Sequence, residues 1–205
     1  MQHDVTLSGH GISLVPLSPW HAHALHGFID SELWAGMAAS QPQSVDDLAG
    51  LFTTRLGDPG SIAFAVAHES TGQTLGTTSL TDYSHAQQRT DIGGTFFGRP
   101  YWGTPANRAS KHLLLAYAFD VLDVDRVGFR CDARNTRSAT AISRLGASYE
   151  GTLRSHRLAP DGTRSDTAVF SILRDEWPGV RDRLLERLAV MEWPTEQPAP
   201  HGWAA

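Results

Sequence analysis

The sequence predicts one α/β (α+β) domain, in which a mixed sheet of about seven strands is flanked by four to five helices. Short segments with alternating apolar residues, typical of strands, are interspersed with longer segments of helical periodicity. The 205 residues, 40% of them hydrophobic, suffice for one sizeable core but are few for two full domains. We therefore expect a single domain over residues 1–192 and an irregular tail, with prolines and small residues, over residues 193–205.

The N-terminal half is expected to run strand, helix, helix and then three strands. Ser18 followed by Pro19 is typical of a helix start, which predicts the first helix over residues 20–30. Ser44 and Asp47 can form a capping box, so a second helix should begin there and end at Gly57. Alternating segments then predict strands over residues 62–69, 74–82 and 89–97.

The C-terminal half begins with a long helix over residues 106–122, where Leu114, Ala118 and Leu122 recur at helical spacing. Gly146 is placed to end a shorter helix. The other predicted elements are a strand over residues 126–132, the short helix over 138–145, strands over 149–157 and 166–173 joined by a turn at 160–162, and a last helix over 176–191. Ligands are expected where a strand leads into a helix N-terminus.

Composition excludes several classes of function. The formal net charge of -5 argues against a nucleic-acid or anionic-membrane partner, because both need clustered Lys and Arg. The only cysteine, Cys131, allows no internal disulfide, and neither a secretory signal nor a run of about 20 apolar residues is evident, so we expect a cytoplasmic protein. We expect no metal, since no Cys pair exists and His21, His23 and His26 do not share one helical face.

The segment that carries chemistry runs from Thr95 to Asn107, where a strand ends, a glycine-containing loop turns and the long helix begins. Thr104 is placed to cap this helix, with Pro105 at its first position. Free N–H groups and the positive end of the dipole make such a helix start an anion site that suits a pyrophosphate. The alternative is purely structural: Gly103 makes the turn and Thr104 caps the helix.

Over residues 5–188, an ordered set of short motifs resembles the RimJ/RimL-like branch of the GNAT acetyltransferases (ribosomal-protein-alanine and amino-acid N-acetyltransferases). The motifs include Trp102-Gly103-Thr104, Asn107, Lys111, Asn135, Arg137-Ser138, Arg144-Leu145-Gly146-Ala147 and Glu176-Trp177-Pro178. The resemblance implies a GNAT fold in which two parallel strands splay apart and admit acetyl-CoA as cosubstrate. It also implies acetyl transfer to a primary amine, such as a protein N-terminus, an amino acid or a small amine, by direct attack in a ternary complex.

The same resemblance implies the cofactor contacts. The backbone of Phe96 and Phe97 pairs with the pantetheine amides, Asn135 and Ser138 face the cofactor near its sulfur, and Arg144 reaches the adenosine phosphate. The pyrophosphate lies on the loop formed by Trp102, Gly103, Thr104, Pro105, Ala106 and Asn107. Pro105 departs from the family, because a glycine normally donates a backbone N–H there; one charge-assisted hydrogen bond fewer weakens binding by about 1.5–3 kcal/mol.

Acetyl transfer to an amine needs a base, an oxyanion donor and a proton for the departing thiolate. Backbone N–H groups around residues 96–97 are the candidate oxyanion donors. The resemblance implies that Ile142 stands where some members of the family have a tyrosine acid, so Ser138 or water is the candidate proton source. The candidate bases are Asp91, His156 and Glu150, although each could instead be an ordinary surface residue. The candidate residues of the acceptor pocket are Trp34, Tyr83 and Glu150.

Two further readings stay open. The chain could be a catalytically silent GNAT-fold module that binds CoA or a partner, as Pro105 and the undetermined base would allow. An acetyltransferase acting on aminoacyl-tRNA is disfavoured by the acidic balance.

By analogy with related proteins we also expect a homodimer, in which Trp193 and Trp203 of the tail pack on a neighbouring chain.

Overall fold

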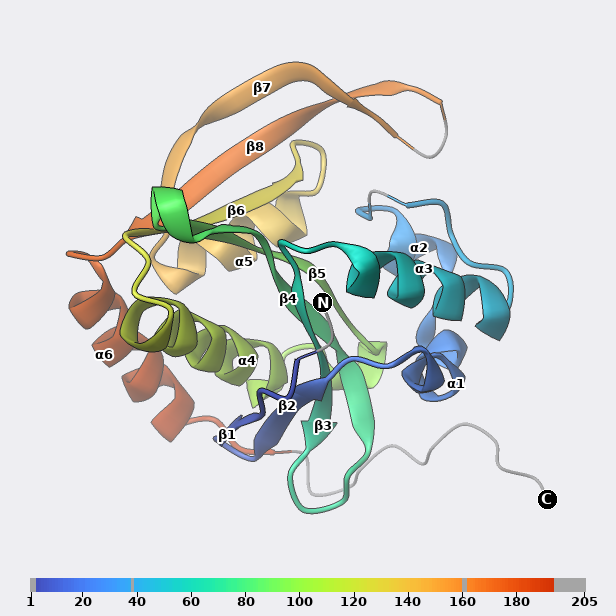
Figure 1. Ribbon diagram of the computed structural model, residues 1–205, viewed down its shortest axis with the longest axis horizontal. Helices are drawn as coiled ribbons and strands as arrows, with labels where there is room; N and C mark the ends of the chain where they lie inside the picture. The colour runs from blue at the N-terminus through green and yellow to red at the C-terminus, as the bar shows by residue number, and fades with distance from the viewer. Residues whose placement is uncertain (1–2, 38, 160–161, 194–205) are drawn as a thin grey trace.

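The computed structural model describes residues 3–37, 39–159 and 162–193, which form one eight-stranded mixed sheet with helices on both faces (Figure 1). The strand order is β1-β2-β3-β4-β5-β6-β8-β7. The strands are β1 (Leu7–Gly9), β2 (Ile12–Pro16), β3 (Ile62–His68), β4 (Thr74–Ser84), β5 (Arg89–Phe97), β6 (Arg126–Asp132), β7 (Ser148–Leu158) and β8 (Arg164–Leu173). The α-helices are α1 (Ala22–Leu25), α2 (Ser31–Trp34), α3 (Val45–Gly57), α4 (Pro105–Ala116), α5 (Thr136–Leu145) and α6 (Trp177–Ala189).

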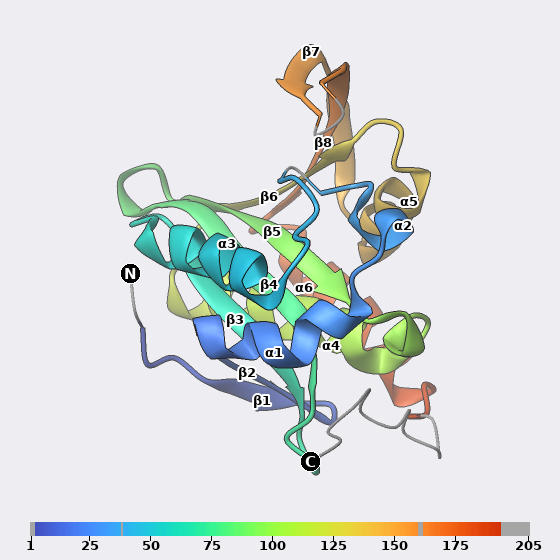
Figure 2. The same ribbon diagram turned by 90° about the vertical axis from the view of Figure 1, so that its right-hand side faces the viewer.

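The sheet separates two hydrophobic cores. Figures 1 and 2 show α1 and α3 on one face and α4 and α6 on the other. Successive residues of β3 belong to different cores: Phe64 and Val66 pack in the cluster with α4 and α6, whereas Ala63 and Ala65 pack in the cluster with α1 and α3. A strand buried on both faces reads as a continuous apolar run, which explains the composition of β3.

The predicted mixed fold is confirmed, with two differences at the N-terminus. The single initial strand is a hairpin, β1 and β2, whose turn uses positive φ angles at His10 and Gly11 (56° and 81°). The predicted helix over residues 20–30 is wrong in its length, since it breaks into short α and 3₁₀ turns and a separate helix α2. Gly27 weakens helical continuity, and the Asp30 side chain caps a new helix start by accepting from the Leu33 N–H.

The bounds of β5 and β6 are those predicted, and these neighbouring parallel strands separate along their length. Their register runs only from Arg89 opposite Arg126 to Ile92 opposite Phe129. Beyond this point β5 remains paired with β4 and β6 remains paired with β8. The sheet therefore opens between residues 93–97 of β5 and the end of β6.

The opening coincides with a β-bulge in β5. Ser79 of β4 lies opposite Gly93 and Thr77 lies opposite Phe96, so Gly94 and Thr95 face the single residue Thr78 and have no register partner. Gly94 has φ +56°, in the left-handed region that glycine favours.

The remaining predicted elements lie close to their expected positions. Ser44 and Asp47 form the capping box of α3. The long helix begins at Pro105 after the Thr104 cap and ends in a π-helical turn, Tyr117–Val121. Of the predicted turn at 160–162, residues 160 and 161 lie outside the described residues, as does the tail from residue 194 with Trp203.

Trp193 packs on its own chain. Its ring lies 4.8 Å from that of His68, and its indole N–H donates to the His10 carbonyl at 3.3 Å. Trp193 is therefore half-buried on its own chain, and its packing on a neighbouring chain stays a prediction. No helix in the described ranges is long and apolar enough to span a bilayer.

Candidate active site

The loop between β5 and α4 lies directly after the point where the strands separate. Thr104 caps α4: its hydroxyl accepts from the Ala106 N–H at 3.3 Å and donates to the Tyr101 carbonyl at 2.7 Å. Gly103 has φ +78° and open space around its missing Cβ, so the turn rather than crowding requires glycine. Because Pro105 has no N–H and the Ala106 N–H is occupied, the anion donor left in the first turn of this helix is the Asn107 amide.

Trp102 closes the side of this loop that faces β5. Its indole N–H donates to the Phe97 carbonyl at 2.9 Å. The guanidinium groups of Arg99 and Arg137 lie 5.0 Å and 4.2 Å from the centre of its ring, in cation–π geometry. The Phe97 carbonyl therefore already accepts one hydrogen bond, and its second lone pair can accept one more.

Ion pairs join α2 to both sides of the opening. Arg99, after β5, pairs with Asp30 at 2.7 Å and with Glu32 at 2.9 Å. Arg137, on α5, pairs with the other oxygen of Glu32 at 3.0 Å. Hydrogen bonds from Arg99 hold the pKa of the Asp30 carboxyl well below its usual range and lower the pKa of Glu32. Because these groups are exposed, salt should weaken the pairs.

Asn135 and Ser138 lie at the start of α5, after the second of the diverging strands. The Asn135 side chain caps α5 by accepting from the Ser138 N–H at 3.0 Å, and its amide nitrogen abuts Gly36 in the segment after α2. The Ser138 side chain is next to the thiol of Cys131, and it lowers the pKa of that thiol less than burial raises it. Cys131 is buried, as expected, and burial raises the pKa of its thiol.

Asp91 lies on the α3 face of β5, in the stretch still paired with β6. Its carboxylate is 15% exposed, pairs with the Arg130 guanidinium at 3.1 Å and lies against Gly128, where no larger side chain fits. Burial raises the pKa of Asp91, and the charge of Arg130 opposes this shift. A general base works best when its pKa lies near the pH of the reaction. The raised pKa therefore suits the Asp91 carboxylate to this role.

Glu150 makes a poorer base. Both of its carboxylate oxygens accept from Arg126, and the Ser171 hydroxyl donates to it at 2.8 Å. Hydrogen bonding to Arg126 lowers the pKa of Glu150 to about 2. Its proton affinity at neutral pH is therefore low, and its position on the exposed strand β7 leaves a role in binding the acceptor open.

His156 opens onto a pocket of about 170 Å³ that is also lined by Arg130, Cys131, Arg157 and Thr167. Its Nδ1 is hydrogen-bonded to the Thr167 hydroxyl at 3.1 Å, which leaves Nε2 without a bond in the described part of the chain. Arg130 thus contacts Asp91 and borders the pocket of His156, so the structure brings these two candidate bases to one region.

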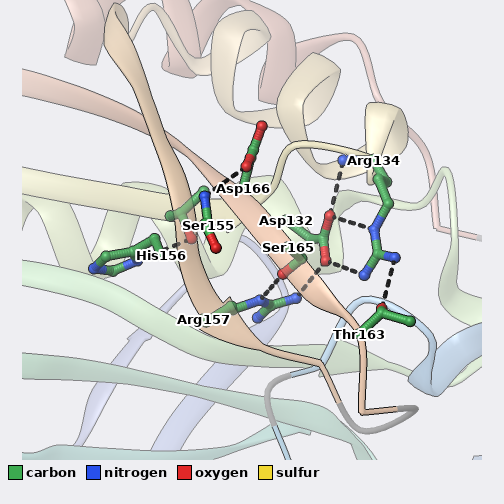
Figure 3. Close-up of polar contacts among 9 residues, drawn as sticks. Asp132, Arg134, Ser155, His156, Arg157, Thr163, Ser165 and Asp166 are labelled. Atoms are coloured by element: carbon green, nitrogen blue, oxygen red, sulfur yellow. Dashed lines mark hydrogen bonds and ion pairs between the residues drawn. The ribbon is translucent and has the colours of Figure 1, made fainter.

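A buried carboxylate fixes one wall of this pocket (Figure 3). Asp132, 3% exposed, accepts from Arg134 at 2.9 Å and from Arg157 at 2.8 Å. Arg157 also donates to Ser165 at 3.1 Å, so its guanidinium is held between β6 and β8. These hydrogen bonds, that from Arg134 first, hold the pKa of Asp132 well below its usual range.

The two aromatic residues expected in the acceptor pocket lie on different faces of the sheet. Trp34 is buried against Phe96, with ring centres 5.5 Å apart, and its indole N–H donates to the Ala39 carbonyl at 2.8 Å. Tyr83 packs on the core that includes α4 and α6. The structure therefore brings Trp34, but not Tyr83, close to the opening in the sheet.

Arg144 lies within a group of three arginines from three helices. A guanidinium N–H of Arg187, on α6, donates to the Arg144 carbonyl. Burial lowers the pKa of Arg108, on α4, and the charges of Arg187 and Arg144 lower it further. None of the three has an ion pair with a carboxylate among the described residues. We call Arg108, Arg144 and Arg187 the basic cluster.

The sequence did not identify several polar residues at the opening as functional groups. They are Arg55, Arg99, Lys111, Arg130 and Arg137. A signal existed for Lys111, because it stands three and four residues before the buried Leu114 and Leu115, on the apolar side of α4. The arginines carried no comparable signal, since their partners come from distant elements.

Comparison with known proteins gives the family. The model of the acetyltransferase (GNAT) domain matches residues 12–148, which is more than half of the chain. An uncharacterised N-acetyltransferase of Bacillus licheniformis is 28% identical over 116 residues, which cover 57% of this chain and 64% of that protein. The chain thus spans less than two thirds of the length of this relative.

Solved structures agree with the family match. A structure named as an acetyltransferase from T. thermophilus is 35% identical, with a TM-score of 0.84, and the match covers 92% of this chain and 99% of that one. Mycobacterium smegmatis RimJ in complex with CoA-disulfide is 18% identical with a TM-score of 0.78, over 93% of this chain and 98% of that one, which shows the fold alone. The chain belongs to the GNAT acetyltransferase family.

Proposed function

We propose that this chain is an acetyl-CoA-dependent N-acetyltransferase that transfers the acetyl group directly to a primary amine. The observation that carries the proposal is the separation of β5 and β6 after Ile92 and Phe129, next to the N-terminus of α4. An extended thioester cofactor fits an opening that is flanked by unpaired strand and by the start of a helix. The RimJ structure, which has the same fold, was solved in complex with CoA-disulfide.

Within this proposal the pyrophosphate lies at the loop from Trp102 to Asn107 and the pantetheine runs along Phe96 and Phe97. The Phe97 carbonyl can accept a pantetheine amide with its second lone pair while the Trp102 indole keeps the first. The Ser138 hydroxyl donates its proton to the departing thiolate and recovers one from solvent water, so that no alkoxide remains.

The base in this proposal is Asp91, with His156 as its alternative. Asp91 lies one residue before the last paired residue of β5 and has a raised pKa, and Arg130 orients its carboxylate. His156 lines the neighbouring pocket, which accepts the amine. The acceptor is a primary amine of a peptide, an amino acid or a small molecule.

A thiol-release assay tests the proposal. Wild-type protein is given acetyl-CoA and, one at a time, amino acids, short peptides and polyamines, and free CoA is measured together with the mass of the acetylated amine. We expect amine-dependent CoA release with at least one class. Binding of acetyl-CoA in titration calorimetry without any amine-dependent release would instead favour the silent CoA-binding module, for which the loss of one donor at Pro105 is the supporting observation.

The basic cluster is expected to hold the 3′-phosphate of the cofactor's adenosine. The charges of Arg187 and Arg144 repel that of Arg108, and a phosphate relieves this repulsion. Replacing Arg108 or Arg144 by alanine should weaken acetyl-CoA binding about 10-fold or more, with little effect on 3′-dephospho-acetyl-CoA, since one charge-assisted hydrogen bond is worth about 1.5–3 kcal/mol. Titration calorimetry with both ligands measures this difference.

The matched control is Arg181→Ala on α6, because Arg181 is exposed and already paired with Asp182 at 3.3 Å. This variant should bind both ligands as the wild type does. If Arg108→Ala lowered the affinity for both ligands equally, the cluster would not recognise the 3′-phosphate.

A further inference from the structure

Two basic side chains hold the bulge of β5 from opposite faces of the sheet. Lys111 reaches it from α4 and Arg55 reaches it from α3, and Figures 1 and 2 show these helices on opposite sides of the sheet. Neither side chain meets a carboxylate among the residues that the structure describes. A buried cation without a counterion is costly, so its retention points to a role beyond packing.

Lys111 is 6% exposed and its nitrogen has two hydroxyl partners. It donates to the Thr95 hydroxyl at 2.6 Å and to the Thr78 hydroxyl at 3.0 Å. These two hydroxyls lie 2.9 Å apart, so the three groups form a closed triangle beneath the bulge. Thr95 is itself half-buried and has no register partner on β4 or β6.

Arg55 holds the neighbouring peptide group from the other face. Its Nη1 donates to the Gly94 carbonyl at 3.1 Å, and the Thr77 hydroxyl donates to the same oxygen at 2.9 Å. Arg55 packs so closely on Gly94 that a Cβ there would lie 2.6 Å from the guanidinium carbon. A Cβ at position 94 would therefore push the Arg55 guanidinium away from the Gly94 carbonyl, and the positive φ itself favours glycine.

These contacts fix the direction of one peptide plane. Because a trans peptide is planar, the Thr95 N–H points opposite to the Gly94 carbonyl, which is held toward Thr77 and Arg55. The N–H is thus directed away from Thr77 and Arg55, and at Thr95 neither β4 nor β6 supplies a register partner for it. Side chains, rather than the ladder of the sheet, keep this donor in place.

We propose that Lys111 is a positioning residue for acetyl transfer: by holding Thr95, it fixes the bulge whose backbone N–H meets the thioester oxygen. This inference rests on the proposed function. The thioester oxygen gains negative charge when the amine attacks, and a donor stabilises it only if its direction is already set. Lys111 acts through Thr95, so its loss should affect turnover more than cofactor affinity.

The test compares Lys111→Met, which keeps the length of the side chain, with Thr95→Val, which removes the hydroxyl, and Thr95→Ser, which keeps it. Ser110→Ala is the control, because Ser110 is buried beside Lys111 but its hydroxyl bonds only within α4, to the Asn107 carbonyl. For each variant, kcat is measured with the best amine and the Kd of acetyl-CoA is measured by calorimetry. Circular dichroism checks that each variant is folded.

We expect Lys111→Met and Thr95→Val to lower kcat about 10- to 100-fold, with the Kd of acetyl-CoA within about 3-fold of wild type. Thr95→Ser should retain most of the turnover and Ser110→Ala nearly all of it. A folded Lys111→Met with wild-type kcat, or a parallel loss of kcat and affinity, would overturn the positioning role. If Lys111→Met does not fold, the contrast between Thr95→Val and Thr95→Ser decides the question. A wild type that binds acetyl-CoA but acetylates no amine would instead overturn the proposed function and this inference with it.

Discussion

Replacing Asp91 by asparagine is expected to lower kcat about 100-fold, because a positioned base contributes roughly 10²- to 10⁴-fold to a proton-transfer step. Asparagine keeps the shape that packs on Gly128 and can still accept from Arg130, so the fold and the Kd of acetyl-CoA should change little. The measurement is steady-state kinetics with acetyl-CoA saturating and the best amine varied.

The pH profile gives this prediction a second readout. A base acts in its unprotonated form, so turnover should fall as the pH falls through the pKa of Asp91. Burial raises this pKa, which moves the acidic limb of the kcat profile above the range of an ordinary aspartate. Asp91→Asn should remove this limb, whereas a residue that merely supported the structure would leave its midpoint unchanged.

His156→Gln is the informative comparison. Glutamine can keep a hydrogen bond to Thr167, the partner of His156 in the pocket wall, but cannot take a proton. If His156 only lines the acceptor pocket, this change should raise the KM of the amine with a small effect on kcat. A large loss of kcat in His156→Gln together with near-wild-type kcat in Asp91→Asn would reverse the assignment of the base.

The elements that flank the opening could be predicted because their signals are local. The alternation of β5 and β6 stops at turn residues, which gave both strands their bounds. Thr104 and Pro105 fix the start of α4 by capping and by a preset φ, again within a few residues. The prediction of one helix over residues 20–30 was wrong because the break is not set by a local signal alone. The Asp30 side chain caps α2, and this contact competes with continuation of the first helix.

The interior of the site depends on contacts between distant residues, which no local pattern contains. The bulge arises from the register of β4 against β5, where Gly94 and Thr95 lie opposite the single residue Thr78 without a register partner. The pairing of Asp91 with Arg130 requires the parallel register of β5 and β6. A sequence can indicate which residues are unusual, such as Lys111 among leucines, but the register decides what they touch.

The largest effect on stability is expected from Lys111 and should depend on pH. Burial lowers the pKa of the Lys111 ammonium to about 7, whereas an unfolded lysine has a pKa near 10.4. Between these values the folded chain holds fewer protons than the unfolded chain, so the free energy of unfolding rises with pH. Below about pH 7 both states are protonated, and the cost of burying the charge is fully present.

Urea denaturation of the wild type and of Lys111→Met at pH 6.5, 8 and 9.5 measures this effect. Taking the difference between the two proteins cancels the titration of all other groups. Relative to Lys111→Met, the wild type should gain about 3 kcal/mol between pH 6.5 and 9.5, because each pKa unit corresponds to about 1.4 kcal/mol. Ser110→Ala should track the wild type at every pH.

A difference that stays constant with pH would mean that Lys111 keeps its proton in the folded protein. The ammonium would then need a negative charge near Thr78 and Thr95, where the structure shows only hydroxyls. Because the neutral amine can also donate to these hydroxyls, the bulge should be held on both sides of the titration. The kinetic defect of Lys111→Met should therefore persist at pH 9.5, where its stability penalty relative to Ser110→Ala is greatest.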